Sequence, residues 1–263
     1  MKPLRKRDIP RRLRGTRPRP PVGPANTLAA AFEEEVSRWE AAIASVVDQW
    51  ERRNPVRARL DSKWIREKIK LLSAEIDGAD KRVLPAIEKV AARVVKSVKV
   101  EKTVLTRVTM RGAPGVAIDA YRAANVARIK SIAQERLWEF SDLLDEAEAG
   151  GWRVERLAKA IREQFDVSRS KAKLLAKDQT LKLGAAITKE RQTQSGITRY
   201  IWSTSGDERV REGHRDLDGT VQSWDDPPDT GDGERNHPGE DYQCRCVAIP
   251  VLPDLSADEE PED

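Results

Sequence analysis

The feature that most constrains the fold is a long stripe of apolar side chains with the period of an α-helix. Its members follow one another at steps of three and four residues: Leu28, Phe32, Val36, Trp39, Ile43, Val46 and Trp50. Residues at this spacing share one face of a helix, and that face needs other elements to cover it. We expect this helix to begin at Asn26, as its N-cap, and to end at Asn54-Pro55, because a residue before proline avoids the helical conformation.

Similar patterns predict further helices along most of the chain. Their expected ranges are 59–76, 80–97, 118–149, 152–165 and 168–191, the last with Ser168 as its N-cap. Residues 98–117 are expected to form a connection with a short strand. Helix breakers separate these segments, so a packed bundle with short turns is favoured over one long coiled-coil rod.

The composition and pattern of the sequence change after Gly196. Residues 197–204 are rich in β-branched and aromatic side chains and predict a strand, and residues 246–250 predict a final short one. The predicted fold class is therefore α+β, with a long helical N-terminal region over 25–165 and a small C-terminal α+β unit over 166–253.

The two ends of the chain carry opposite charge. Residues 1–24 contain nine Lys or Arg, one Asp and several prolines, whereas residues 254–263 contain six Asp or Glu and no basic residue. Proline opposes regular structure and like charges repel, so we predict a disordered basic arm and a solvated acidic tail. The arm is either a solvated end or a contact for nucleic acid or an acidic partner. Its candidate nucleic-acid-binding residues are Arg5, Lys6, Arg7, Arg11, Arg12, Arg14, Arg17 and Arg19.

The chemically richest segment lies in the C-terminal unit. Both histidines and both cysteines of the chain fall within the 33 residues from His214 to Cys246. Imidazole and thiolate are the ligands that zinc prefers, so His214, His237, Cys244 and Cys246 are candidate metal ligands. A single residue separates the two cysteines, which is not a standard zinc spacing. In an extended strand both would point to one face, where they could share an ion or simply be small buried apolar groups.

A catalytic interpretation of the same segment is also open. His214 lies near Arg209 and Asp216 in the sequence, a mixture that could provide general acid–base chemistry beside phosphate-binding groups in a nuclease or nucleotide-transfer enzyme. The alternative is that these charged residues form a network of ion pairs and turns. No nucleophile at a recognised spacing accompanies them, so we predict that the protein is not an enzyme.

Several classes of protein are excluded or disfavoured. No apolar run is long enough for a transmembrane helix, and the basic start lacks the apolar stretch of a secretory signal. Two cysteines so close together do not form a disulfide framework, which fits a cytosolic origin. Neither phosphate-binding glycine motif occurs, which argues against an ATP-driven motor such as a terminase.

A series of short motifs extends over roughly 165–250. The motif core of this segment is Arg209, Arg211, His214, Asp216, Asp218, Gly219, His237, Asp241 and Arg245. The motifs around it are Asp178-Gln179, Arg191-Gln192, Gly196-Ile197, Tyr200-Ile201-Trp202, Thr204, Asp207, Trp224, Pro227-Pro228, His237-Pro238-Gly239-Glu240-Asp241 and Cys244-Arg245-Cys246. Each motif is weak by itself, but as an ordered string they resemble the phage Mu F-like minor head protein family, also called phage head morphogenesis proteins.

The resemblance implies a function for the whole chain. It implies a minor capsid protein of a tailed bacteriophage that acts in head assembly near the portal, with the portal and other head proteins as partners and possible contact with packaged DNA. The expected location is the virion, in the capsid interior or at the portal vertex, after assembly in the host cytoplasm, with no membrane partner. Members of this family often have a long, divergent helical region before the shared domain, as this chain does.

Overall fold

The computed structural model describes residues 4–53, 62–76, 78–98, 115–163, 165–231 and 233–252. Long helices make up most of this part of the chain: α1 (Val22–Arg53), α2 (Ser62–Ile76), α3 (Ala79–Ser97), α5 (Gly115–Ala149), α6 (Val154–Glu163) and α7 (Phe165–Gln194). A few short antiparallel strands follow them, so the predicted α+β class is confirmed. Most of the predicted connection over 98–117 and the whole acidic tail lie outside the described residues.

Two helices begin earlier than the sequence predicted. Helix α1 starts at Val22 rather than after Asn26, directly behind Pro20-Pro21. Pro24 falls in its first turn, where a missing N–H costs no helical hydrogen bond, so the prolines do not delay the helix. Helix α7 starts at Phe165, and Ser168 lies inside it rather than at its N-cap.

The chain forms two compact units, each assembled from segments far apart in the sequence. The helical unit comprises Asn26–Val90 and Arg122–Lys177, and the mixed unit comprises Met1–Ala25, Ala91–Tyr121 and Asp178–Asp263. The sequence analysis predicted two continuous domains that meet at residue 165. In the structure each unit is discontinuous, and some of the long helices contribute residues to both units.

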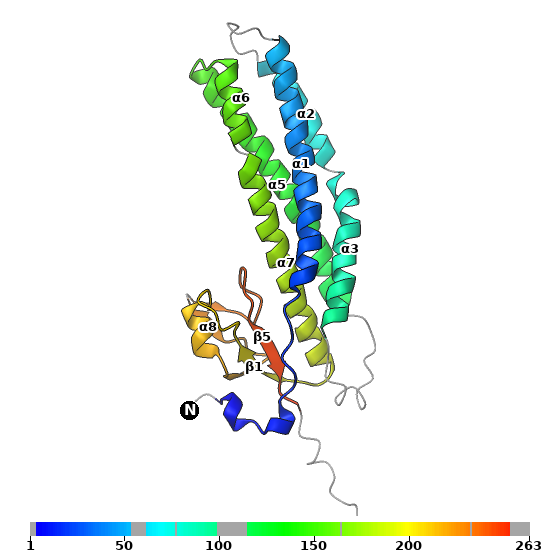
Figure 1. Cartoon of the computed structure of the whole chain (residues 1–263), viewed down its shortest axis with the longest axis vertical. Helices are drawn as coiled ribbons and strands as arrows, with labels where there is room; N and C mark the ends of the chain where they lie inside the picture. The colour runs from blue at the N-terminus through cyan, green and yellow to red at the C-terminus, as the bar shows by residue number, and fades with distance from the viewer. Residues whose placement is uncertain are drawn as a thin grey trace, which may run out of the picture. The chain divides into compact units, whose positions relative to one another are not determined.

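The helical unit is held together by the apolar stripe of α1. All seven residues of the stripe are buried, as the helical period predicts. Ion pairs also link its helices: Arg82 of α3 binds the buried carboxylate of Glu35 on α1, and Arg66 of α2 lies 3.0 Å from Glu148 on α5. Figure 1 shows these helices as the long ribbons of the molecule. None of the helices within the described ranges is long and apolar enough to cross a membrane.

The mixed unit is built on a small antiparallel sheet with β1 at its centre. Strand β1 (Arg199–Ser203) pairs with β2 (Val221–Ser223) on one side and with β5 (Val247–Pro250) on the other. The short helix α8 (Glu212–Leu217) lies in the connection from β1 to β2. A second hairpin, β3 (Asp229–Gly231) and β4 (Glu234–Arg235), follows β2.

Alternation along β1 gives the sheet two different buried faces. One face packs into a cluster that contains the cysteines: Tyr200, Trp202, Trp224, Cys244, Cys246 and Ala248. The opposite face packs into an aliphatic cluster: Ile9, Ile201, Ile249 and Val251, with Leu13 and Val221 beside it. A residue of the basic arm is therefore part of the core.

The basic arm differs from the disordered segment that the sequence predicted. Its described residues include two short 3-10 turns, Lys6–Asp8 and Arg11–Leu13. Lys6 N–H donates to the Gly219 carbonyl at 2.6 Å, and the Leu13 carbonyl accepts from Leu252 N–H at 2.8 Å. The arm thus pairs with both outer edges of the sheet. Sequence analysis missed this because the partner groups lie more than 200 residues away.

Candidate metal centre

His214 is positioned by α8, which packs closely against β3. Gly213 permits this approach, since a Cβ at that position would lie 2.2 Å from the carbonyl oxygen of Thr230. The His214 side chain is buried, with only 2% of its surface exposed. Its ring stands edge-on to Trp202 of β1, with 5.3 Å between ring centroids. Packing from α8 and β1 therefore fixes the ring on the aromatic face of the sheet.

Cys244 and Cys246 lie in the irregular turn that leads into β5, rather than on an extended strand. The turn is shaped at Gln243, whose φ of 55° is uncommon for a residue other than glycine. The Gln243 N–H donates to Asp178 Oδ1 at 2.6 Å, which stabilises this conformation. Within the turn, Cys246 N–H donates to Cys244 Sγ at 3.4 Å. Both thiols are buried and free of any disulfide.

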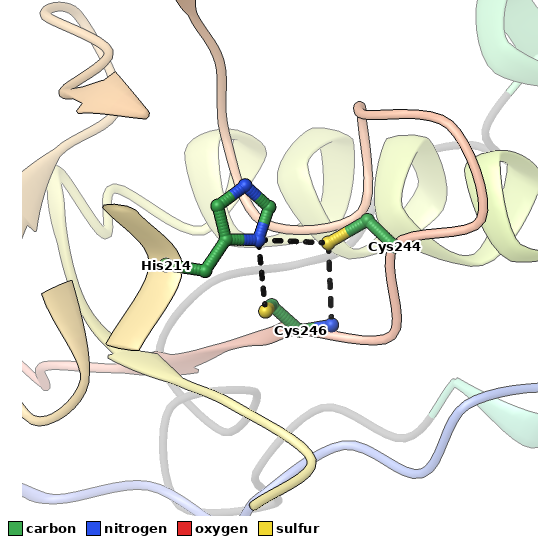
Figure 2. Close-up of side chains that lie close together, drawn as sticks. All are labelled: His214, Cys244 and Cys246. Atoms are coloured by element: carbon green, nitrogen blue, oxygen red, sulfur yellow. Dashed lines mark hydrogen bonds between the residues drawn. The ribbon is translucent and has the colours of Figure 1, made fainter. Parts of the chain in front are cut away.

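The structure brings His214 and the two cysteines together. His214 Nδ1 lies 3.6 Å from Cys244 Sγ and 3.5 Å from Cys246 Sγ. The three side-chain atoms all lie within 4.8 Å of one another. Figure 2 shows the imidazole edge facing both sulfurs, which approach it from the same turn. Two soft sulfur atoms and one imidazole nitrogen are a donor set suited to a thiophilic metal ion.

Asp241 fixes the orientation of the imidazole from its other side. Its Oδ2 lies 2.8 Å from His214 Nε2, and its Oδ1 accepts a hydrogen bond from Asn236 Nδ2 at 2.7 Å. A proton on Nε2 therefore has a carboxylate partner, which leaves the lone pair of Nδ1 directed at the two sulfurs. This arrangement of carboxylate, histidine and soft ligand is typical of metal sites.

The electrostatic environment of the cluster favours a positive charge on His214 and a negative charge on Cys244. Hydrogen bonding to Cys244 and the carboxylate of Asp241 raise the pKa of His214 above its ordinary value. Hydrogen bonds from Cys246 and His214 lower the pKa of the Cys244 thiol, whereas its neighbour Cys244 and burial raise the pKa of Cys246.

His237 does not join this cluster, although the sequence analysis grouped it with the other candidate ligands. Its Nδ1 lies 2.9 Å from the hydroxyl of Tyr200, and its ring packs against Trp224 with 4.9 Å between centroids. Burial and the nearby charge of Lys189 lower the pKa of His237. The two histidines therefore occupy different environments, and the side chain that lies beside His214 Nε2 is Asp241 rather than His237.

Comparison with known proteins relates part of this sequence to a family. Residues 138–249 match the sequence profile of the family described as phage Mu protein F like protein. The chain carries a phage Mu protein F-like region. An uncharacterized protein of Haemophilus influenzae is 37% identical over 145 residues, which cover 54% of this chain and 32% of that protein. The chain thus spans about a third of the length of this relative. No solved structure matches the chain significantly.

The Mu F-like region contains the whole cluster and the charged residues around it. Arg211 donates to the Tyr242 carbonyl at 2.7 Å, and Arg245 forms an ion pair with Asp207 at 2.6 Å. The hydrogen bond from Arg245 lowers the pKa of the Asp207 carboxyl. These contacts tie the loop before α8 to the turn that carries the cysteines, which is a structural role for both arginines.

Asp218 and Gly219 form the turn between α8 and β2. Asp218 Oδ1 accepts from Thr204 N–H at 2.8 Å, and Gly219 adopts a φ of 71°, which favours glycine. Arg209 and Asp216, the partners proposed for a catalytic His214, are both exposed. The carboxylate that the structure brings to the imidazole is Asp241, and not the one that the catalytic interpretation named.

Sequence analysis missed the role of residues on α7 that support the turn. Asp178 binds the backbone of Gln243, as described above. Gln192 is buried and uses both ends of its amide: Nε2 donates to the Ala248 carbonyl at 3.1 Å, and Oε1 accepts from Trp224 Nε1 at 3.1 Å. Asp178 and Gln192 are buried polar residues of α7. Their side-chain partners lie 32 to 65 residues further along the chain.

The basic arm exposes most of its cations while its backbone is bound. Arg14 is half-buried and donates to the Ile9 carbonyl at 2.8 Å. Arg17 donates to the Thr204 carbonyl at 2.6 Å and is otherwise exposed. The exposed members of the predicted nucleic-acid-binding set are Arg5, Lys6, Arg7, Arg11, Arg12, Arg17 and Arg19. The arm therefore presents a fixed, positively charged surface.

Proposed function

We propose that the protein is a minor head protein of a tailed bacteriophage that acts in head assembly. The observation that carries this proposal is the match of residues 138–249 to the phage Mu protein F-like family. The matched residues include His214, Asp241, Cys244 and Cys246, together with the polar contacts that position them. A compact unit of this kind, joined to long helices with charged faces, suits a component that works through protein contacts.

The proposal extends to the place of action. The protein assembles in the host cytoplasm with the portal and other head proteins and remains in the virion, in the capsid interior or at the portal vertex. It acts as a structural component rather than as an enzyme. This is supported by the burial of His214, since a general base needs access to its substrate.

Quantitative mass spectrometry of purified phage particles tests the proposal. The protein is counted against the portal protein in particles purified by density gradient, and an abundant host protein serves as the contamination control. A few copies per particle, well above the host control, is the expected result. If infected cells contain the protein but particles lack it, the proposal fails. Comparing the nuclease activity of the wild type and a His214→Ala variant would then be the next experiment.

We further propose that the basic arm contacts packaged DNA. Clustered arginines neutralise phosphates and release counterions, and the arm holds such residues exposed on a fixed backbone. A double variant, Arg11→Gln with Arg12→Gln, removes two exposed charges and keeps the buried Ile9 of the arm. The matched control, Lys81→Gln with Lys89→Gln, removes the same charge from exposed positions on α3.

The assay is DNA affinity as a function of salt concentration. Each phosphate contact contributes about 0.9 to the slope of log affinity against log salt, so losing two contacts lowers the slope by up to about 1.8. The arm variant is expected to show this change and the α3 control is expected to match the wild type. Equal slopes for the arm variant and the wild type would overturn the role of the arm.

A further inference from the structure

We propose that His214, Cys244 and Cys246 bind one zinc ion that fixes the turn before β5 to helix α8. Neither the family description nor the relative assigns a metal to this region. The ligand atoms are His214 Nδ1 and the sulfurs of Cys244 and Cys246. The site does not depend on the proposed head-assembly role, because it is defined by the geometry of the cluster alone.

The two distances between His214 Nδ1 and the sulfur atoms agree with a tetrahedral zinc site. Zinc–sulfur bonds of about 2.3 Å and zinc–nitrogen bonds of about 2.0–2.1 Å, at the tetrahedral angle, place nitrogen and sulfur about 3.6 Å apart. The observed separations from His214 Nδ1 are 3.6 Å to Cys244 Sγ and 3.5 Å to Cys246 Sγ. Nδ1 therefore lies at the distance from each sulfur that a shared zinc ion requires, and all three ligand atoms lie within 4.8 Å of one another.

Hydrogen bonding among the same atoms is a poorer explanation of the geometry. Nδ1 offers either one lone pair or one N–H in the ring plane, so it makes a good hydrogen bond with only one of the two sulfurs. Both sulfurs nevertheless approach it at nearly the same distance. A shared ion accounts for both approaches, because a metal accepts one bond from each of the three atoms.

The surroundings provide the support that zinc ligands require. Asp241 binds His214 Nε2 and is itself held by Asn236, so the imidazole is fixed in the tautomer that leaves Nδ1 free for a metal. The N–H of Cys246 donates to Cys244 Sγ at 3.4 Å, which stabilises negative charge on that sulfur. Both contacts favour the ligand forms that bind a cation.

The enclosure of the site favours a bound ion over a reactive cysteine. A thiolate paired with a His–Asp couple could act as a nucleophile, but a nucleophile needs room for its substrate. The side chains of His214, Cys244 and Cys246 are all buried, so little of either sulfur is open to a substrate. A water is the usual fourth ligand where the protein supplies three.

The first experiment measures metal content in the full-length protein. The wild type is purified without chelator, dialysed against metal-free buffer and analysed for zinc by inductively coupled plasma mass spectrometry. About one zinc per chain is expected. Replacement by Co²⁺ is expected to give the visible bands of tetrahedral cobalt and a thiolate charge-transfer band. Because this spectrum is recorded on the wild type, it does not depend on a variant that folds.

Two histidine variants form a matched pair. His214→Gln is expected to lose bound zinc, whereas His237→Gln, which changes the other buried histidine, is expected to retain one zinc per chain. Asp241→Asn keeps all three ligands and is expected to weaken zinc binding by about 10- to 100-fold, measured by competition with a chromogenic chelator.

Three outcomes would overturn the proposal. They are a wild type that binds neither zinc nor Co²⁺, equal zinc content in His214→Gln and the wild type, and a cobalt spectrum without thiolate character. Rapid alkylation of one cysteine in protein shown to be metal-free would instead favour the nucleophile, and a mass loss of two hydrogens would indicate a Cys244–Cys246 disulfide.

Discussion

Replacing Gly213 by alanine tests how closely α8 must pack against β3. The added Cβ would lie 2.2 Å from the carbonyl oxygen of Thr230 and 2.8 Å from its carbonyl carbon. An ordinary carbon–oxygen contact is about 3.3 Å or longer, so helix and strand would have to separate by about 1 Å. Both colliding groups belong to the backbone, and no side-chain rotation can relieve the contact.

The expected net effect is a loss of about 2 kcal/mol in the free energy of unfolding of the mixed unit. Overpacking costs about 1–3 kcal/mol, and we take the upper part of this range because the obstacle is backbone. The better helix propensity of alanine offsets up to about 1 kcal/mol. The shift also moves the neighbouring His214, so weaker zinc binding is expected in the same variant.

Hydrogen–deuterium exchange in a urea series is the appropriate assay, since peptides from residues 199–252 report on the mixed unit alone. The control is Gly23→Ala in the first turn of α1, where a Cβ meets no atom within 4 Å. The control is expected to be neutral or stabilising by up to about 1 kcal/mol. A Gly213→Ala protein as stable as the wild type would refute the packing argument.

Two further predictions concern buried charge. Glu35→Gln should destabilise the helical unit by about 2 kcal/mol, because it removes the carboxylate that Arg82 binds through Nε and Nη2. Unchanged urea unfolding would contradict this. The pKa of His237 is lowered by burial and by Lys189, so the unfolded chain takes up a proton near pH 6.5 while the folded chain does not. Stability should thus be full above about pH 6.5 and fall as the pH drops below it. The fall should be shallower in His237→Gln, and equal pH profiles would contradict the assignment.

The helical part of the fold was predictable because its signal is local. The stripe from Leu28 to Trp50 repeats with the helical period, and every one of its members is buried in the structure. The starts of α1 and α7 were less well predicted. Each prediction placed an N-cap at a polar residue, Asn26 or Ser168, where the helix had already begun. Capping propensity is a weak guide when a helix can start at prolines or continue through a serine.

The candidate site was only partly predictable, because it depends on long-range contacts. The concentration of histidine and cysteine directed attention to this segment, and the structure brings three of the four candidate ligands together. The exclusion of His237 was not predictable. It depends on the turn at Gln243, which is held by Asp178, 65 residues away in the sequence. It also depends on the Tyr200 hydroxyl, which occupies Nδ1 of His237. Nothing in the spacing of the ligands records either contact.

Strand β1 connects the two features that the sequence analysis treated separately. Ile201 faces the aliphatic cluster that includes Ile9 of the basic arm, and its neighbour Trp202 faces the cluster that holds His214 and the cysteines. Deleting the arm would therefore uncover one face of the strand whose other face supports the candidate metal centre. A loss of DNA binding after such a deletion would not distinguish a missing phosphate contact from a disturbed sheet. For this reason the DNA proposal is tested by neutralising exposed cations, which leaves Ile9 and the backbone pairing of the arm in place.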